Sequence, residues 1–283
     1  MNEQSLNPGQ NNSPVAQAVV FTMLGRYSLQ DNTPISTANY IDILGRAGIS
    51  HHASRLILSR MVDRGYLHRI RDGRMAYWAA TDLALAFARR QQARTFPKNA
   101  PMDEGVWTIL SYSIPESRRK DRDRLRKRLE WDGFGLLRDG VWIAAGDREL
   151  TGVLDPAAED EVGQFIEVFT AYPKRLDMEA MIARAWDLDG LRERHAEFLR
   201  DWDVPNPAPM AVDALGRNLL LITRWRKLIR GTSRLPQEYL AEDTLAQRCS
   251  HLFRELYDSY SETGDAIFHG ILENSDKLAP IGV

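Results

Sequence analysis

The segment from Ser36 to Ala80 constrains the fold more than any other part of the chain, because its hydrophobic pattern changes twice. Apolar residues recur at helical spacing before Gly48 and again from Ser50 to about Arg64. The residues that follow alternate as β-strands do, with a turn signal at Asp72-Gly73. We therefore predict a helix, a turn, a second helix and a two-stranded hairpin, which is the order of a winged helix-turn-helix.

The second predicted helix separates apolar from polar residues. Its predicted core face consists of Ala53, Leu56, Ile57, Met61 and Val62, spaced three and four residues apart. The candidate DNA-binding residues are Ser50, His51, His52, Ser54, Arg55, Ser59 and Arg60 on the helix and Arg69, Arg71 and Arg74 on the hairpin. Such side chains can meet base edges and phosphates. The alternative is a winged domain for protein contacts, or a polar helix face that is simply solvated.

Charge is distributed unevenly along the chain. Residues 1–96 hold 11 Arg, no Lys and 6 acids, whereas the remainder of the 283 residues holds 26 basic and 33 acidic residues. A basic N-terminal part on an acidic body would confine the attraction for nucleic acid to one region.

Cys249 is the only cysteine, so an intramolecular disulfide and a cysteine-clustered zinc site are both excluded. Its helical surroundings favour a buried small apolar residue over a reactive thiol. We find no membrane-spanning run and no secretion signal, and we expect a soluble cytoplasmic protein without a cofactor or metal.

The predicted N-terminal domain covers residues 13–96. Residues 1–12 are polar and predict a disordered tail. Ser13-Pro14 predicts the start of a helix, and Thr81-Asp82 predicts a cap for another. Residues 97–104 predict a linker.

The central part, residues 105–173, predicts a ferredoxin-like domain with β-α-β-β-α-β order. A strand at 106–114 precedes a charged helix from Glu116 to Trp131, and a hairpin with Asp139-Gly140 at its turn follows. A helix near 148–154 and a strand near 165–170 complete the pattern. The charged helix could be a second nucleic-acid surface, but Leu125 and Leu129 favour a packed helix with a solvated charged face.

Residues 174–283 predict an all-helical C-terminal domain, with long helices near 212–230 and 243–261. The expected fold is therefore multidomain and of the α+β class. On one of these helices, Arg224, Trp225, Arg226 and Arg230 are candidate ligand-binding residues, because arginine can hold an anion and tryptophan can stack on a ring. The alternative is an interdomain seam with a packed Trp225 and paired arginines.

The strand that ends in YSIPES before the charged helix resembles the small ferredoxin-like nuclease subunits of CRISPR adaptation systems. Those proteins place an aspartate at the end of this strand to hold a metal, and here the position is Ser113. A hydroxyl cannot replace a metal-holding carboxylate. We therefore expect that the chain is not an enzyme. A metal-dependent nuclease or RNA-processing protein, based on the central domain, is the alternative.

Over nearly its full length the chain resembles the PaaX family of transcriptional repressors. The resemblance rests on SRLILSRMVDRGYLHRIRDGRMAYWAATD, on WTILSYSIPESRRKDRDRLRKRLEWDGFGLLRDGVWIA, and on LLLITRWRKLIRGTSRLPQEYL with FRELYDSY. It implies a homodimeric repressor that binds a palindromic double-stranded DNA operator. It also implies release by an aryl-CoA thioester or a related catabolic intermediate, so that an acyl-CoA effector is the expected small-molecule partner. The family's DNA-reading positions carry over onto Arg55, Arg60, Arg71 and Arg74. A nucleic-acid-binding adaptor without a small ligand is a third hypothesis.

Overall fold

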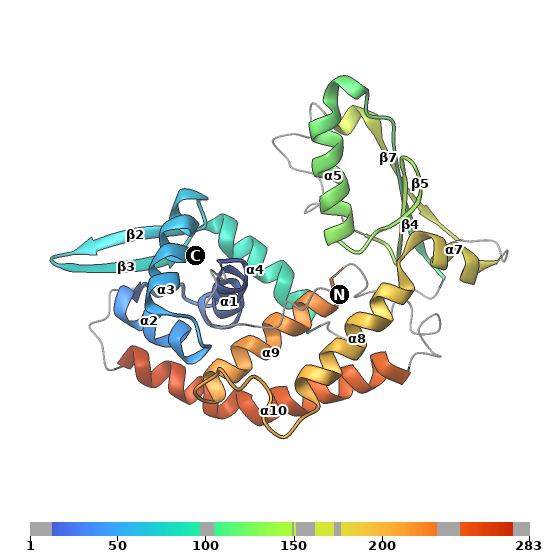
Figure 1. The fold of residues 1–283 in the computed structure, drawn as a ribbon. Helices are drawn as coiled ribbons and strands as arrows, with labels where there is room; N and C mark the ends of the chain where they lie inside the picture. The colour runs from blue at the N-terminus through green and yellow to red at the C-terminus, as the bar shows by residue number, and fades with distance from the viewer. Residues whose placement is uncertain are drawn as a thin grey trace. The chain divides into compact units, whose positions relative to one another are not determined.

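The computed structural model of the chain describes residues 13–96, 105–148, 150, 162–172, 177–230 and 244–273. The predicted tail and linker lie outside these residues, as does most of the helix predicted near 148–154. The described part contains helices and two antiparallel sheets, which confirms the α+β class (Figure 1). The chain divides into two compact units. The first draws on Met1–Pro97, Phe198–Lys227 and Cys249–Val283, and the second on Lys98–Glu197 and Leu228–Arg248.

The N-terminal part of the first unit has the predicted order of helix, turn, helix and hairpin. Its elements are α1 (Ser13–Met23), β1 (Ile35–Ser36), α2 (Thr37–Arg46), α3 (His51–Asp63), β2 (Leu67–Asp72), β3 (Met75–Ala80) and α4 (Asp82–Thr95). The β2–β3 hairpin projects from the helices beside it (Figure 1). The short strand β1 was not predicted; it pairs with β3 and extends the hairpin to a three-stranded sheet in the order β1-β3-β2.

Side-chain caps explain where the helices of this part begin. The hydroxyls of Ser36, Ser50 and Thr81 accept hydrogen bonds from backbone N–H groups three residues later, at 3.1, 3.3 and 3.2 Å. Such caps satisfy backbone donors that a helix leaves free at its first turn. At Gly48 the backbone has φ +77°, which glycine adopts without the cost of a Cβ clash, and this allows the tight turn between α2 and α3.

One hydrophobic core joins the N-terminal elements to the C-terminal helices α9 (Ala214–Leu228) and α10 (Thr244–Glu273). Leu215 and Leu219 of α9 and Phe268 of α10 are buried in the same cluster as the core residues of α1 to α4. The helix α10 continues well beyond the predicted end near residue 261. Its apolar residues continue at helical spacing to pack on this core, and they override the weak helix preference of Thr263-Gly264.

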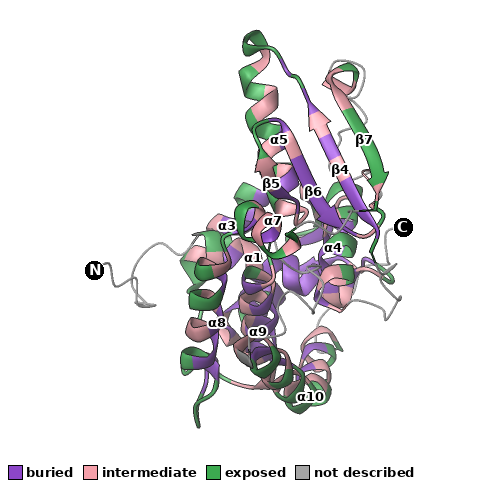
Figure 2. Cartoon of the chain, turned by 90° about the vertical axis from the view of Figure 1, so that its right-hand side faces the viewer, coloured by how far each residue is buried: buried purple, intermediate pink, exposed green. Residues whose placement is uncertain are grey.

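The second unit is built on a four-stranded antiparallel sheet with the strand order β5-β6-β4-β7. Its strands are β4 (Trp107–Tyr112), β5 (Gly135–Arg138), β6 (Val141–Ala145) and β7 (Ile166–Ala171). The predicted central strand, the hairpin and the last strand are confirmed. Strands β4 and β6 lie inside the sheet and are largely buried, whereas β7 forms an exposed edge (Figure 2).

Alternate residues of this sheet serve two separate cores, as the period of two along a strand requires. On one face, Trp142 of β6 packs with Leu125 and Leu129 of α5 (Arg119–Trp131). On the other face, Ile143 packs with Ile182 and Trp186 beside α7 (Met178–Ala185). Helix α8 (Leu188–Trp202) follows.

The charged helix α5 has the predicted solvated face, preceded by a short 3-10 turn at Glu116–Arg118. Leu125 and Leu129 are its buried residues, and ion pairs join Arg119 to Asp123 at 3.9 Å and Arg124 to Asp121 at 3.6 Å. Its charges therefore include local pairs of the kind that stabilise an exposed helix. Among the described helices, none combines the length and the apolar character that crossing a bilayer requires.

Candidate nucleic-acid interface

Helix α3 is anchored by a buried face that differs in detail from the predicted one. Ile57, Leu58 and Met61 are almost completely buried, whereas Leu56 is only half-buried. The predicted face included Leu56 and left out Leu58, so the true buried stripe is rotated around the helix. Burial of this stripe determines which residues of α3 face the solvent on the opposite side.

Most of the predicted DNA-binding side chains on α3 are exposed. His52, Arg55 and Ser59 are exposed and spaced three and four residues apart, so they share one helix face. His51 and Arg60 are exposed on either side of this face. The exposed face thus presents imidazole, guanidinium and hydroxyl groups, all of which can bond to base edges or phosphates.

Two serines near the start of α3 have local hydrogen-bonding roles. Ser54 is fully buried, and its hydroxyl donates to the backbone carbonyl of Ser50 at 3.0 Å. The prediction that Ser54 faces outward is therefore wrong, because its small side chain can bond back onto the preceding turn and fill a core position. Ser50 is exposed, but its hydroxyl caps the helix.

The predicted wing keeps its arginines exposed. Arg69, Arg71 and Arg74 are all exposed on or beside the β2–β3 hairpin. The Arg69 guanidinium lies 5.6 Å from the centre of the Trp78 ring on the neighbouring strand. The Trp78 indole N–H donates to the Thr37 hydroxyl at 2.8 Å, which joins the hairpin to the start of α2. The hairpin and the helices therefore form one connected surface.

The four candidate ligand-binding residues lie in different environments. Trp225 is buried, stacked on Phe253 with 4.5 Å between ring centres, so its ring is not available to stack on a ligand. Arg224 pairs with Asp201 at 2.9 Å. Arg230 belongs to the second unit, where its guanidinium lies 3.7 Å from the centre of the Trp131 ring. Of the two possibilities that the sequence left open, a Trp225 that stacks on a ligand and a packed Trp225, the structure shows the packed one, because the core of the first unit takes up this ring.

Arg226 is the exception among these residues. Its guanidinium donates to the hydroxyls of Thr95 at 2.8 Å and Thr22 at 3.3 Å, which belong to α4 and α1. No carboxylate within the described residues forms an ion pair with it, and burial lowers the pKa of Arg226 to about 10. A buried charge that is satisfied only by hydroxyls costs stability.

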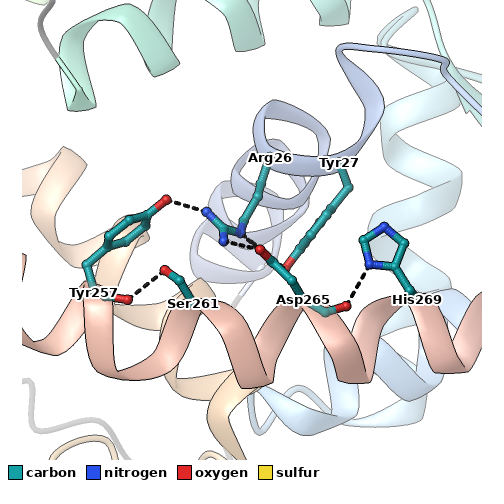
Figure 3. A network of polar contacts seen from close by, with 6 residues as sticks. All are labelled: Arg26, Tyr27, Tyr257, Ser261, Asp265 and His269. Carbon is teal, nitrogen blue, oxygen red and sulfur yellow. Dashed lines mark hydrogen bonds and ion pairs between the residues drawn. The ribbon is translucent and has the colours of Figure 1, made fainter.

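A polar network that the sequence analysis missed joins the turn after α1 to α10 (Figure 3). Arg26, on the π-helical turn at Leu24–Ser28, donates from Nε and Nη2 to the Asp265 carboxylate at 2.8 and 2.6 Å. It also donates to the Tyr257 hydroxyl, and Tyr27 donates to Asp265 at 2.8 Å. The signal was present in the sequence: Tyr257, Ser261 and Asp265 recur every four residues on a helix that also carries apolar residues.

The pKa values within this network follow from burial and pairing. Burial lowers the pKa of Arg26, but the neighbouring Tyr27, Asp265 and Tyr257 outweigh it and raise the value. Burial raises the pKa of Tyr27, and the hydrogen bond to Asp265 raises it further. The network therefore holds a charged guanidinium and a neutral phenol.

Two further residues that the sequence singled out are Ser113 and Cys249. Ser113 is exposed after the end of β4. Within the described ranges, His, Cys, Asp and Glu side chains form no cluster of three or more that could hold a metal. Cys249 is fully buried in α10, as predicted.

Comparisons with known proteins place these observations in a family. Residues 15–84 match the model of a PaaX-like protein, residues 100–183 match the PaaX protein central Cas2-like domain, and residues 186–270 match the PaaX-like protein C-terminal domain. The transcriptional repressor PaaX of Escherichia coli (strain K12) is 26% identical over 230 residues, which cover 76% of this chain and 72% of the repressor.

A solved structure shares the fold of the chain. The uncharacterized protein Rv0674 from Mycobacterium tuberculosis matches with a TM-score of 0.58 and 24% identity, over 89% of this chain and 97% of that one.

Three domain models of the same family match successive parts of the chain, at residues 15–84, 100–183 and 186–270. The chain belongs to the PaaX family.

Proposed function

We propose that this protein is a transcriptional repressor that binds a DNA operator through α3 and the β2–β3 hairpin. The observation that carries the proposal is the exposed face of His52, Arg55 and Ser59. It lies in the same compact unit as the exposed arginines of the hairpin. The similarity to the repressor PaaX supports a regulatory role for the whole chain.

In this proposal the N-terminal part is a winged helix-turn-helix, with α3 as the recognition helix and the β2–β3 hairpin as the wing. A recognition helix reads bases with side chains near its N-terminus. On α3 these would be His51, His52 and Arg55, with Ser59 and Arg60 one turn further along. Arg69, Arg71 and Arg74 would contact the DNA backbone or the adjacent minor groove.

We propose a ferredoxin-like fold for the central domain. Its strand order β5-β6-β4-β7 and its antiparallel pairing agree with that fold, and α5 connects β4 to β5 as the fold requires. The nuclease alternative gains no support, because a metal-dependent reaction needs carboxylates where the chain has Ser113.

The proposed repressor acts as a homodimer on a palindromic operator and is released by a small effector, an acyl-CoA thioester or a related catabolic intermediate. Two recognition helices then meet half-sites about one helical turn of DNA apart, or a multiple of it. The effector must bind the DNA-incompetent arrangement more tightly, since equal affinity for both arrangements shifts nothing. A raised thermal midpoint with a candidate metabolite would separate this repressor from an adaptor without a ligand.

The test is the substitution Arg55→Ala, with Arg90→Ala as the matched control on the exposed side of α4. The operator is first selected from a random duplex library with the wild-type protein. We expect Arg55→Ala to weaken operator binding by about 1–3 kcal/mol, the usual cost of losing a base contact. Arg90→Ala should bind as the wild type does. An unchanged affinity in folded Arg55→Ala protein would show that α3 is not the recognition helix.

A further inference from the structure

The loop that leads into α9 lies directly against the turn between α2 and α3, although some 160 residues separate the two in the sequence. The backbone N–H of Val212 donates to the carbonyl of Arg46 at 2.8 Å. That carbonyl lies in the last turn of α2, where a helix leaves its acceptors without partners. The loop therefore caps the first helix of the proposed helix-turn-helix.

Asp213 bonds to both helices at this junction. One of its carboxylate oxygens accepts from the backbone N–H of Gly216 at 3.1 Å, in the first turn of α9. The other accepts from the Arg46 guanidinium, which also contacts Asp42 at 3.2 Å. The Asp213 side chain is only 19% exposed, so its charge is held against the end of α2.

Two glycines show how closely the backbones meet. A Cβ added to Gly216 would lie 1.9 Å from the carbonyl oxygen of Arg46 and 3.1 Å from the nitrogen of Ala47. A Cβ added to Gly48 would lie 3.0 Å from the Cβ of Met210. The start of α9 thus touches the turn itself, with no room for a methyl group between them.

We infer that Met210, Val212, Asp213 and Gly216, which we call the α9 brace, form a positioning element for DNA recognition. The inference rests on the proposed function. Helix α3 begins three residues after Gly48, so a displacement of the turn moves the N-terminal end of α3, which carries His52 and Arg55. The brace holds the recognition helix in place without contacting DNA itself.

A positioning role differs from a purely stabilising one in its effect on specificity. Base contacts depend on the exact placement of α3, whereas attraction between arginines and phosphates tolerates small displacements. Loosening the brace should therefore reduce binding to the operator much more than binding to an unrelated duplex of the same length. It should leave the folded state intact, because Leu215 and Leu219 remain in the core.

The experiment compares Asp213→Asn and Gly216→Ala with the wild type in the full-length chain. Asp201→Asn is the matched control, because Asp201 forms a partly exposed ion pair with Arg224 at 2.9 Å elsewhere in the first unit. Dissociation constants are measured on the selected operator and on an unrelated duplex, together with thermal unfolding. We expect operator affinity to fall by about tenfold or more in both brace variants, which corresponds to about 1.4 kcal/mol. Non-specific affinity should stay within about twofold, and Asp201→Asn should match the wild type on both duplexes.

If folded Asp213→Asn protein keeps the wild-type ratio of operator to non-specific affinity, the brace is not a positioning element. An equal loss on both duplexes would also overturn the inference, since it would indicate damage to the fold alone. If Gly216→Ala prevents folding, Asp213→Asn decides the matter, because replacing the carboxylate by a carboxamide adds no heavy atom. A wild-type protein that selects no DNA sequence would instead refute the proposed function.

Discussion

The network around Asp265 provides the most direct test of how the C-terminal helices stabilise the first unit. Asp265→Ala removes the acceptor for Nε and Nη2 of Arg26 and for the Tyr27 hydroxyl (Figure 3). The Arg26 side chain is 15% exposed and would lose its only carboxylate partner among the residues shown in this network. The hydroxyls of Tyr257 and Tyr27 would remain as hydrogen-bond acceptors for Arg26.

The magnitude follows from the geometry. A hydrogen bond to a charged group contributes about 1.5–3 kcal/mol, and an arginine left buried without its carboxylate raises the cost. The Asp265 side chain is 38% exposed, so solvent screens part of the interaction. We expect a loss of about 2–3 kcal/mol in the free energy of unfolding, or a thermal midpoint lower by about 4–12 °C for a unit of this size.

The assay is thermal and urea unfolding followed by circular dichroism, with Asp201→Ala as the control. Asp201 pairs with Arg224 at the surface, and such pairs contribute about 0–1 kcal/mol. Should Asp265→Ala prove no more destabilising than Asp201→Ala, the network would contribute nothing beyond an ordinary surface ion pair. The partial burial of Arg26 would then not strengthen its pairing with Asp265.

Two further predictions concern buried ionisable groups. Arg226→Met should leave the free energy of unfolding unchanged or raise it by about 1 kcal/mol, because methionine fills similar space without the cost of a buried charge; urea unfolding measures this. Complete burial raises the pKa of Tyr40, so the stabilising contribution of its neutral phenol is fully present below about pH 10 and is lost as the pH rises further. The free energy of unfolding should therefore fall less steeply in Tyr40→Phe than in wild type above about pH 10, and equal slopes would contradict the assignment.

The sequence predicted the order of elements well where local chemistry determines it. The hydroxyl side chains of Ser36, Ser50 and Thr81 cap helices, a role for which serine and threonine are preferred. Gly48 forms the turn between α2 and α3 because glycine readily adopts a positive φ. Each of these features depends on residues a few positions apart. Nearby sequence was therefore sufficient to place α2, α3, the hairpin and α4.

Features that depend on distant contacts could not be predicted in the same way. Strand β1 has only two residues, and its pairing with β3 depends on tertiary structure. Serine is common at protein surfaces, which favoured an exposed Ser54. Its hydroxyl instead donates to the Ser50 carbonyl, so burying it costs little free energy. Trp225 stacks on Phe253 of another helix, and the spacing of residues along the sequence does not reveal this partner.

Three of the polar links within the first unit join arginine side chains of one part to the other, between the N-terminal elements and the C-terminal segments. Arg46 and Asp213 meet at the turn before α3, Arg226 of α9 bonds to Thr22 and Thr95, and Arg26 bonds to Asp265 of α10.

The first and third links join opposite charges, whereas the second holds a guanidinium against hydroxyls only, among the described residues. An anion that reached Arg226 would therefore pair with a guanidinium that has only hydroxyl partners among the described residues. At Arg46 and Arg26, an anion would have to displace the carboxylate of Asp213 or Asp265. Because Asp213 immediately precedes α9 and bonds to its first turn, a shift of this helix would be transmitted to the turn before α3 through a direct contact. Arg226, one of the four candidate ligand-binding residues, thus joins α9 directly to α1 and α4.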